Sequence, residues 1–250
     1  MNQFVKNVKR IEFAVTYACT GKCKHCSEGD HLGCTDHIDK DVAIKAVRDI
    51  CENYKIESLM TFGGEPLLYP ETTCAIHKVA SELKIPSRQL ITNGYFTKDP
   101  KRIYAVAEDI ALSGVNDLLL SADAFHQETI PLDAVKSFAS CLVDLKVPVH
   151  LSPAWLVSEK DPNSYNLRTR EILDSFAPLE IPVGTGNVIF PSGNALKYLS
   201  EYLDPSMASP YEDDPLDVRC ISFGPSGEVD LLGGNIYETP IMDIVKSYKV

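Results

Sequence analysis

Short apolar runs alternate along the chain with longer stretches in which apolar residues recur every three or four positions. The short runs predict strands at 11–16, 58–62, 89–92, 117–121, 147–152 and 186–190. The longer stretches predict amphipathic helices at 41–52, 71–83, 100–112, 132–145 and 164–176. Strands and helices that alternate in this way are typical of βαβ units, which build a parallel sheet.

Six β/α repeats predict an α/β fold, a partial (β/α)6 barrel of the TIM type, because a closed barrel needs eight repeats. A doubly wound sheet is the alternative. After residue 200 the repeats stop, and residues 201–217 are acidic, contain three prolines and predict a linker or lid. Residues 218–250 predict a small β-plus-helix cap with a glycine-containing turn at 224–227, a short strand near 229–232 and a terminal helix near 241–248. The expected divisions are therefore a barrel over 1–200, a linker or lid over 201–217, and a cap over 218–250.

The composition narrows the classes of protein and partner. A chain of 250 residues with 44% hydrophobic residues can bury a core, so disorder is excluded as its main state. A net charge of −11 argues against a nucleic acid partner bound through phosphate neutralisation. No apolar run reaches the roughly 18 residues that span a bilayer, and residues 1–10 do not resemble a signal peptide. We therefore expect a cytoplasmic protein without a membrane partner.

Three of the eight cysteines lie together directly after the first predicted strand. Cys19, Cys23 and Cys26 form a Cys-x3-Cys-x2-Cys run, a spacing at which three thiolates on one loop converge on one metal centre. In a reducing compartment such a group indicates metal binding rather than a disulfide framework. A [4Fe-4S] cluster held in this way keeps one iron without a protein ligand. A zinc site is the alternative, with a fourth ligand from Cys34, His25, His31 or His37.

A second motif, Gly63-Gly64-Glu65-Pro66, ends the second predicted strand. Because the two glycines have no side chains, the backbone there can approach a ligand closely, and the proline ends the strand. Together the two motifs resemble those of the radical S-adenosylmethionine (SAM) superfamily, in which a ring-bearing residue precedes the last cysteine of the triplet. His25 holds that position in this sequence.

The resemblance implies one [4Fe-4S] cluster, held by Cys19, Cys23 and Cys26, and SAM as cofactors. An electron would cleave SAM reductively, and the 5′-deoxyadenosyl radical would take a hydrogen atom from a substrate. The residues that the resemblance implies as SAM contacts are His25, Gly63, Gly64, Glu65, Asn93, Ser121, Asp123 and Val188. For Asp123 an alternative role is that of the cap of a helix that begins near 129.

The C-terminal segment resembles the start of a SPASM or twitch extension, where a cysteine is followed by a P-x-G-x-V turn and a second cysteine. Cys220 and the turn Pro225-Ser226-Gly227-Glu228-Val229 are present, but no cysteine follows them. One thiol cannot hold a cluster, so we expect a single [4Fe-4S] centre and a cap without auxiliary cluster ligands. Cys220 is then either a buried residue or a catalytic acid or hydrogen donor that faces the substrate.

The resemblance also bears on partners. Relatives with such extensions modify peptides or proteins, which favours a peptide or protein side chain as substrate, with a small molecule as the alternative. Residues 1–27 carry five basic residues against one acidic residue, a local charge of +4. Such a patch would dock an acidic flavodoxin-like or ferredoxin-like electron donor. The basic residues are Lys6, Lys9, Arg10, Lys22 and Lys24.

Two other functions compete with a radical SAM enzyme. A non-catalytic barrel would hold an iron-sulfur cluster or zinc as a structural or redox-sensing element, but it would have no use for polar residues at several strand ends. An ordinary SAM methyltransferase would need a glycine-rich first turn, and the sequence contains nothing that resembles one.

Overall fold

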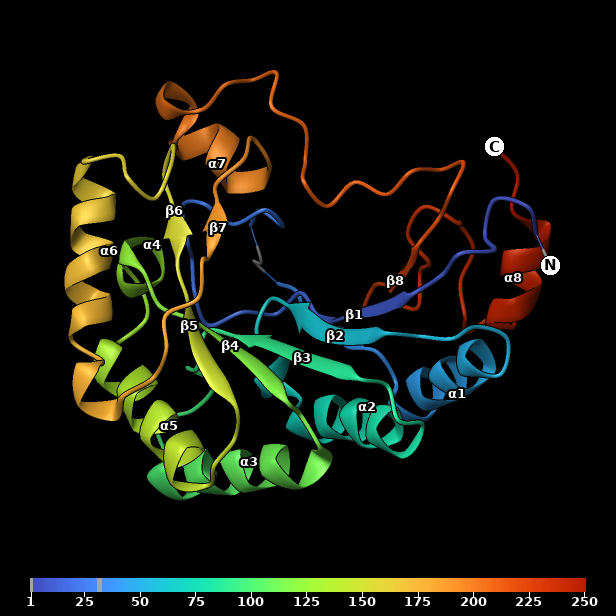
Figure 1. The fold of residues 1–250 in the computed structure, drawn as a ribbon, viewed down its shortest axis with the longest axis horizontal. Coiled ribbons are helices and arrows are strands. Elements are labelled where there is room, and N and C mark those ends of the chain that lie inside the picture. The colour runs from blue at the N-terminus through green and yellow to red at the C-terminus, as the bar shows by residue number, and fades with distance from the viewer. Residues whose placement is uncertain (1, 31–32) are drawn as a thin grey trace.

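A six-stranded parallel sheet forms the centre of the fold in a computed structural model that describes residues 2–30 and 33–250 (Figure 1). Its strands lie in the order β5-β4-β3-β2-β1-β8, and all neighbouring pairs are parallel. They are β1 (Arg10–Thr16), β2 (Ser58–Gly63), β3 (Ser87–Thr92), β4 (Asp117–Ser121), β5 (Val149–Ser152) and β8 (Cys220–Phe223). A separate two-stranded parallel sheet pairs β6 (Ala154–Trp155) with β7 (Asn187–Val188).

Four helices cover one face of the main sheet, below the strands in Figure 1: α1 (Lys40–Cys51), α2 (Pro70–Glu82), α3 (Pro100–Ser113) and α5 (Leu132–Asp144). The other helices are α4 (Ala124–Gln127), α6 (Ser164–Asp174), α7 (Gly193–Tyr198) and α8 (Ile241–Ser247), with short 3-10 helices η1 (Pro66–Leu68), η2 (Ala177–Leu179) and η3 (Ser200–Tyr202). Asp39 and Asp99 accept hydrogen bonds from the first N–H groups of α1 and α3, which fixes where these helices begin. Within the described residues, no helix is both long and apolar enough to cross a membrane.

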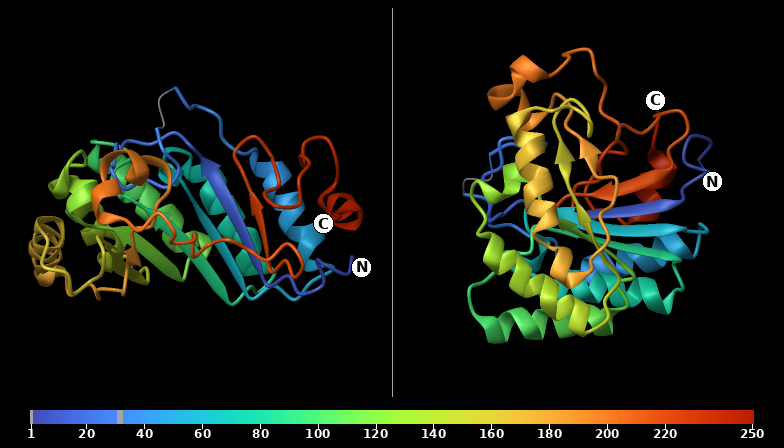
Figure 2. Two further views of the ribbon diagram at one scale, coloured as in Figure 1. Left: turned by 90° about the horizontal axis from the view of Figure 1, so that it is seen from above. Right: turned by 60° about the vertical axis from the view of Figure 1, so that its left-hand side comes forward.

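The arrangement of the helices excludes a doubly wound sheet. In such a sheet the helices cover both faces and the strand order reverses at a switch point. Here β1 to β5 are adjacent in chain order, and the four covering helices lie on one face (Figure 1). In Figure 2 the curved sheet and its helices form part of a barrel wall, and α6 and α7 lie near β6 and β7. The parallel α/β arrangement predicted from the sequence is confirmed.

Apolar side chains fill the space between the sheet and its helices in two large clusters. One cluster joins β1, β2 and β8 to α1, α2 and α8, and the other joins β3, β4 and β5 to α3, α5 and α6. Phe13 of β1 and Phe223 of β8 are fully buried, and their rings stack at a centroid distance of 4.7 Å. The last strand of the chain is therefore held to the first by side-chain packing as well as by backbone pairing.

The five predicted helices and the first five predicted strands are confirmed to within two residues at each end. The strand predicted at 186–190 is shorter and pairs with β6, because Ile189 packs in a small third apolar cluster beside that strand. The sixth place in the main sheet belongs to β8, which the sequence assigned to the C-terminal cap. In place of the strand expected at 229–232, the chain forms a turn with one isolated bridge, from Val229 to Phe223.

Candidate functional site

The cysteine triplet lies on the loop that follows β1, residues 17–30, named here the Cys loop. Because β1 is parallel to both of its neighbours, this loop leaves the sheet at the edge where the carboxyl ends of the strands meet. Cys23 is buried, and Cys19 and Cys26 are half-buried. Active sites of α/β barrels lie at this edge of the sheet, so the cysteine triplet lies where an active site is expected in this fold.

Polar groups surround the sulfur of Cys19. The backbone N–H of Gly21 donates to its Sγ at 3.3 Å, and the side-chain amide of Asn93 donates at 3.6 Å. Burial raises the pKa of Cys19 to about 12, and burial also raises the pKa values of Cys23 and Cys26. The three thiols are therefore neutral in the metal-free chain at pH 7, and metal binding must release their protons.

The Gly-Gly-Glu motif packs against the beginning of the Cys loop. The N–H of Gly64 donates to the Thr16 carbonyl at 2.7 Å, and the N–H of Glu65 donates to the Ala18 carbonyl at 2.8 Å. A Cβ at Gly64 would lie 2.2 Å from the Ala18 carbonyl oxygen, and a Cβ at Gly63 would lie 2.3 Å from that of Thr16. The sequence predicts that these glycines admit a ligand. The structure shows a further role for them, a close approach to the chain's own backbone that fixes the direction in which the Cys loop starts.

The Glu65 carboxylate is fully buried and joins the end of β2 to the end of β3. It accepts hydrogen bonds from the Leu67 N–H at 2.9 Å, the Thr92 hydroxyl at 2.7 Å and the Asn93 N–H at 2.8 Å. Burial raises the pKa of Glu65 to about 7, although these donors oppose the shift. The Asn93 side chain continues to the Cys loop, where it donates to the Thr20 hydroxyl at 3.2 Å. Glu65 and Asn93 thus tie two strand ends to the loop.

Two further predicted SAM contacts lie in different sheets. Ser121 is buried at the carboxyl end of β4, opposite Ser152 of β5. Val188 is 39% exposed and pairs with Trp155 of β6. The structure therefore brings Ser121 to the same edge of the main sheet as the Cys loop, whereas Val188 lies on the separate two-stranded sheet.

Asp123 is fully buried directly after β4 and caps α4. Its Oδ1 accepts hydrogen bonds from the N–H groups of Phe125 and His126, both at 2.9 Å. Its Oδ2 accepts from the Ala154 N–H at 3.0 Å and lies 2.8 Å from Nδ1 of His126. Burial alone would raise the pKa of Asp123, but the His126 ring and these N–H groups hold it below its usual range. The helix-capping alternative is confirmed, for a helix that begins at the next residue rather than near 129.

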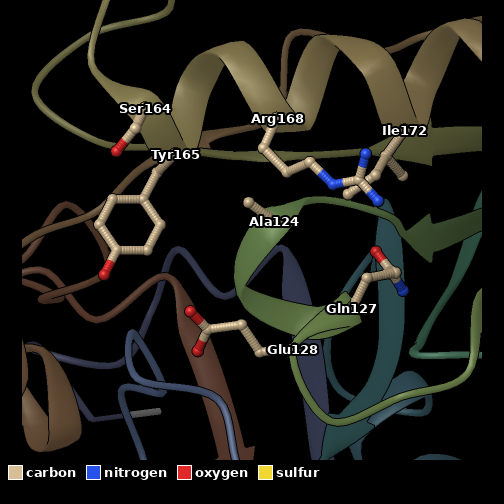
Figure 3. A pocket seen from close by; sticks show the side chains of 7 residues that line it. All are labelled: Ala124, Gln127, Glu128, Ser164, Tyr165, Arg168 and Ile172. Atoms are coloured by element: carbon tan, nitrogen blue, oxygen red, sulfur yellow. The ribbon is translucent and has the colours of Figure 1, made fainter.

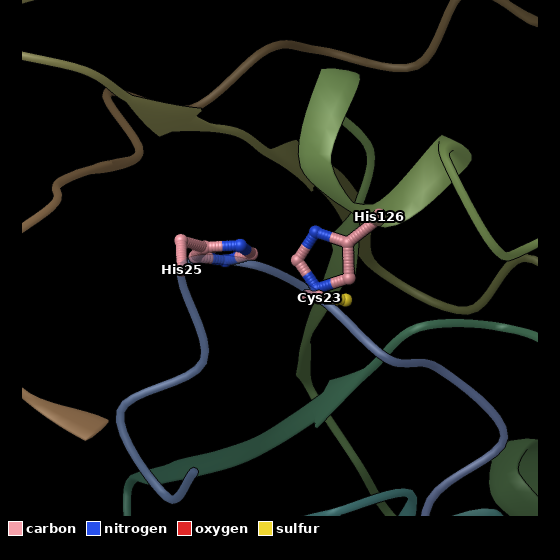
Figure 4. Close-up of side chains that lie close together, drawn as sticks. All are labelled: Cys23, His25 and His126. Carbon is pink, nitrogen blue, oxygen red and sulfur yellow. The ribbon is translucent and has the colours of Figure 1, made fainter. Parts of the chain in front are cut away.

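His126 is a site residue that the sequence did not single out (Figure 4). Ligand atoms of Cys23, His25 and His126 all lie within 4.8 Å of one another. The centroids of the His25 and His126 rings are 4.8 Å apart, and the buried Nδ1 of His25 has no hydrogen-bond partner among the described residues. Burial lowers the pKa of His25 to about 4, so its ring is neutral at pH 7. The available sequence signal was the spacing of Asp123 and His126, three residues apart at a strand end.

A segment from the last third of the chain closes over the Cys loop. The N–H of Asn194 donates to the Cys26 carbonyl at 2.9 Å, and its side-chain amide donates to the carbonyls of Cys23 and Gly29 at 3.2 and 3.3 Å. Gly193 has a φ of +46°, and a Cβ there would lie 2.5 Å from the Cys26 carbonyl oxygen. These contacts fix the backbone between the second and third cysteines.

Cys220 lies far from the Cys loop. It is the first residue of β8 and pairs with Arg10, the first residue of β1. Both therefore lie at the amino end of the parallel strands, and the 7 residues of β1 separate this level from the Cys loop by about 20 Å. This placement favours the alternative to a catalytic role for Cys220, a partly buried structural cysteine.

The predicted basic patch is divided between the two ends of the sheet. Lys9 and Arg10 lie at the amino end of β1, where each pairs with a glutamate. Lys22 and Lys24 lie on the Cys loop, and Lys24 pairs with Glu128 at 3.0 Å. The sum of charges over 1–27 therefore does not describe one surface, because β1 carries its first and last residues to opposite edges.

Of the candidate fourth zinc ligands proposed from the sequence, His25 lies beside Cys23, whereas Cys34 and His37 are not part of that group. The ring of His37 stacks on that of Tyr69 at a centroid distance of 3.9 Å, and His31 lies outside the described residues. Across residues 2–30 and 33–250, the group of three metal-binding side chains that does form is that of Figure 4, which contains neither His37 nor Cys34.

The donor set of the Cys loop fits a [4Fe-4S] cluster. Three soft sulfur ligands, each at least half-buried, stand on one loop whose backbone is held by the ends of β1 and β2 and by the start of α7. The three cysteines would hold the cluster. Asn93 and Ser121, at the same edge of the sheet, are placed to contact a ligand bound to it.

A pocket of about 520 Å³ opens beside the Cys loop, at the carboxyl ends of β1, β2 and β8. Burial and nearby carboxylates raise the pKa of Tyr17 in this pocket to about 12. A smaller pocket of about 280 Å³ lies between α4 and α6, where Tyr165 and Arg168 line it (Figure 3). Aromatic rings and carboxylates line the larger pocket, from Tyr17, Phe62, Phe223, Glu28, Glu228 and Asp230.

Comparisons with known proteins agree with this site. The family model of the radical SAM superfamily matches residues 13–139. A Methanocaldococcus jannaschii protein named as a glycyl-radical enzyme activating enzyme is 32% identical over 87 residues, which are 34% of this chain and 32% of that protein. The GTP 3′,8-cyclase of Desulforamulus reducens is 22% identical over 131 residues, which are 52% of this chain and 38% of the cyclase. The matches thus span about a third of these relatives' own length.

Solved structures share the fold at low sequence identity. Streptococcus suis SuiB bound to S-adenosylmethionine has a TM-score of 0.64 at 14% identity, over 98% of this chain and 66% of SuiB. The protein anSMEcpe with bound AdoMet has a TM-score of 0.62 at 13% identity, over 96% of this chain and 80% of that one. These likenesses confirm the predicted partial-barrel fold class. Since the family model also covers half of the chain, the chain belongs to the radical SAM superfamily, whose enzymes use a [4Fe-4S] cluster and SAM.

Proposed function

We propose that this chain cleaves SAM reductively and takes a hydrogen atom from a substrate held at the carboxyl ends of β1, β2 and β8. One observation carries the proposal: hydrogen bonds join the start of the Cys loop, including Cys19, to the Gly-Gly-Glu motif and Asn93. A structural or redox-sensing barrel, the alternative, needs the cysteines but has no use for polar groups at the strand ends.

The residues of this unit have separate roles. Cys19, Cys23 and Cys26 would hold the cluster, and Asn93 and Ser121 would contact SAM. When bound, the cluster and SAM supply the one-electron chemistry. Glu65 holds the backbone of Asn93 in place from its buried position. The carboxylate oxygens of Asp123 accept hydrogen bonds from backbone N–H groups of α4 and β6, so Asp123 supports the site by fixing the position of α4.

A peptide or protein side chain is the substrate class that we favour. The pocket of about 520 Å³ beside the Cys loop is large enough for a side chain and its flanking residues. Its carboxylates from Glu28, Glu228 and Asp230 would attract a basic segment. The structural neighbour anSMEcpe is also known with a bound Cp18Cys peptide, which supports this class. A small molecule would fit the same volume and is the alternative substrate.

The test is anaerobic reconstitution with iron and sulfide, followed by dithionite, SAM and measurement of 5′-deoxyadenosine. The wild-type chain should form this product, and C23A should form none. C141A is the matched control, because Cys141 lies within α5 on the helix-covered side of the sheet. If reconstituted wild-type protein holds iron but forms no 5′-deoxyadenosine, the enzyme proposal is wrong and the structural alternative is preferred. If 5′-deoxyadenosine does form, transfer of deuterium from labelled basic peptides into this product would identify the substrate.

We further propose that the chain holds a single cluster. Among the described cysteines, Cys220 is the one contributed by the SPASM-like segment, and it lies at the opposite end of the sheet from the Cys loop. Iron analysis near four atoms per reconstituted chain is the expected result. A value near eight would contradict it.

The electron would come from a flavodoxin-like or ferredoxin-like protein, in the cytoplasmic location that the cysteine content favours. Because the basic residues are divided between two edges, docking near the cluster would depend on Lys22 and Lys24 of the Cys loop. The corresponding experiment is the charge reversal of Lys22 described in the Discussion.

A further inference from the structure

The donor atoms of Cys23, His25 and His126 form a compact group that the cluster would use only in part (Figure 4). We propose that, in the cluster-free chain, these three side chains bind one Zn²⁺ ion, and that zinc and the [4Fe-4S] cluster exclude one another because both need Cys23. This inference concerns the chain before its cluster is inserted, and it does not depend on the substrate or on the radical reaction.

The distances permit such a site. The three ligand atoms lie within 4.8 Å of one another. Tetrahedral zinc with nitrogen ligands at about 2.0 Å and sulfur at about 2.3 Å separates its ligands by roughly 3.5 Å. Closure therefore requires the side chains to move together by no more than about 1.5 Å in this estimate. The three protein ligands leave one tetrahedral position for a solvent molecule.

The His126 ring is already oriented as metal-binding histidines are. Its Nδ1 lies 2.8 Å from Oδ2 of the buried Asp123, so the neutral ring that binds a metal would donate its Nδ1 proton to Asp123 and offer Nε2 as the ligand atom. A carboxylate behind the ligating histidine is the usual support of a zinc site, since it fixes both tautomer and orientation. The same carboxylate is held by the N–H groups of α4 and by the Ala154 N–H, so it cannot easily turn away.

His25 supplies the second nitrogen. Its Nδ1 is buried and has no hydrogen-bond partner among the described residues, a costly situation that a metal ion would relieve. The charges also balance. The Cys23 thiol releases one proton to solvent on binding, any second proton on the His126 ring is released as well, and the thiolate and the Asp123 carboxylate together neutralise Zn²⁺ in this buried place.

Cys19 and Cys26 take no part in the proposed zinc site, and this makes the test sharp. The experiment titrates the iron-free, reduced chain with Co²⁺ alone under anaerobic conditions, and then displaces it with Zn²⁺. We expect one Co²⁺ per chain, with tetrahedral ligand-field absorption and a thiolate charge-transfer band. C23S should lose that band, and H25Q and H126Q should each weaken Co²⁺ binding roughly 100-fold. C19S and C26S should bind Co²⁺ as the wild-type chain does.

A second measurement tests the competition. One equivalent of Zn²⁺ added before reconstitution should lower the iron content of the wild-type chain and leave that of H126Q unchanged. Far-UV circular dichroism of each variant checks that the fold is retained, and D123N, expected to weaken Co²⁺ binding by about 10- to 100-fold, reports on the carboxylate behind His126.

Two results would overturn the proposal. If C19S and C26S lose Co²⁺ binding as C23S does, the cysteine triplet itself binds the metal. If folded H25Q and H126Q bind Co²⁺ as tightly as the wild-type chain, the histidines are not ligands. Neither result bears on SAM cleavage, because C19S should lack that activity while keeping the Co²⁺ site.

Discussion

Replacement of Gly64 by alanine tests whether the contact between the Gly-Gly-Glu motif and the Cys loop is needed for function. The added Cβ would lie 2.2 Å from the Ala18 carbonyl oxygen, and contacts under 3.0 Å are essentially never seen. The carbonyl must therefore move by at least 0.8 Å, the difference between these distances. Gly64 does not have a positive φ, so alanine adds no backbone strain there and the effect is steric. The affected carbonyl belongs to the residue directly before Cys19.

We expect the G64A chain to fold with a loss of about 1–3 kcal/mol, the usual cost of overpacking. A shift near 1 Å in the residues that position a reaction typically costs about 100-fold in rate, and we expect a fall of that order in 5′-deoxyadenosine formation. Urea unfolding of the metal-free chain, iron content and the initial rate after reconstitution measure these effects.

G184A is the matched control. Gly184 also has no positive φ, and a Cβ there would first meet the His150 ring at 2.8 Å, a side chain that can rotate away. Its iron content and rate should equal those of the wild-type chain. If G64A also reaches wild-type iron content and rate, the close backbone approach is not what fixes the Cys loop, and our account of the motif is refuted.

Four other outcomes follow from the structure. Because burial raises the pKa of Glu65 from 4.5 to about 7, the folded chain keeps a proton there that the unfolded chain releases between these values. As pH rises through that window, the metal-free wild-type chain should therefore lose about 3 kcal/mol of stability relative to E65Q, measured by urea unfolding of both chains. The comparison with E65Q is needed because the buried His25 and His77, whose pKa values burial lowers, stabilise the fold as pH rises over part of the same range. N194A removes two hydrogen bonds to the Cys loop and should cost about 1–2 kcal/mol in thermal unfolding of the metal-free chain, with less iron bound. C220A should keep the wild-type rate of 5′-deoxyadenosine formation, since Cys220 lies at the amino end of the sheet; a tenfold loss would restore its catalytic role. K22E should slow turnover with a flavodoxin-type donor, more at low salt than at high salt, and leave turnover with dithionite unchanged.

The sequence predicted those parts of the site that depend on neighbouring residues. The three cysteines of the triplet lie on one loop. The spacing of Cys19, Cys23 and Cys26 along the sequence was therefore enough to predict a metal-binding group. The Gly-Gly-Glu motif was recognised for the same reason, but its contact with the Cys loop was not predicted, because which atoms approach Gly64 depends on the pairing of β1 with β2. Helices capped by an aspartate, such as α1, were predicted to within a residue because the cap lies beside the helix.

Contacts between residues far apart in the sequence could not be predicted from the pattern of apolar and polar positions. Ile221 and Phe223 read as a short apolar run in a terminal cap, and only their packing against β1 makes β8 a strand of the main sheet. The Asn194 contacts to the Cys loop depend on where α7 begins in space. His126 could have been found, because Asp123 three residues earlier is a usual partner of a ligating histidine. The position of Cys220 at the amino end of the sheet could not be predicted, because it depends on the register of β8 against β1.

The hold of Asn194 on the Cys loop has a consequence for biosynthesis. Asn194 follows Cys23 by 171 positions. A ribosome that adds about 5–20 residues per second therefore synthesises Asn194 roughly 10 to 30 seconds after the cysteines of the Cys loop. During that interval the Cys loop lacks the hydrogen bonds from Asn194 that fix its backbone. The strand β8, which pairs with β1, has also not been synthesised. Cofactor insertion should therefore follow the synthesis of α7, and a chain truncated shortly before α7 should accumulate without iron.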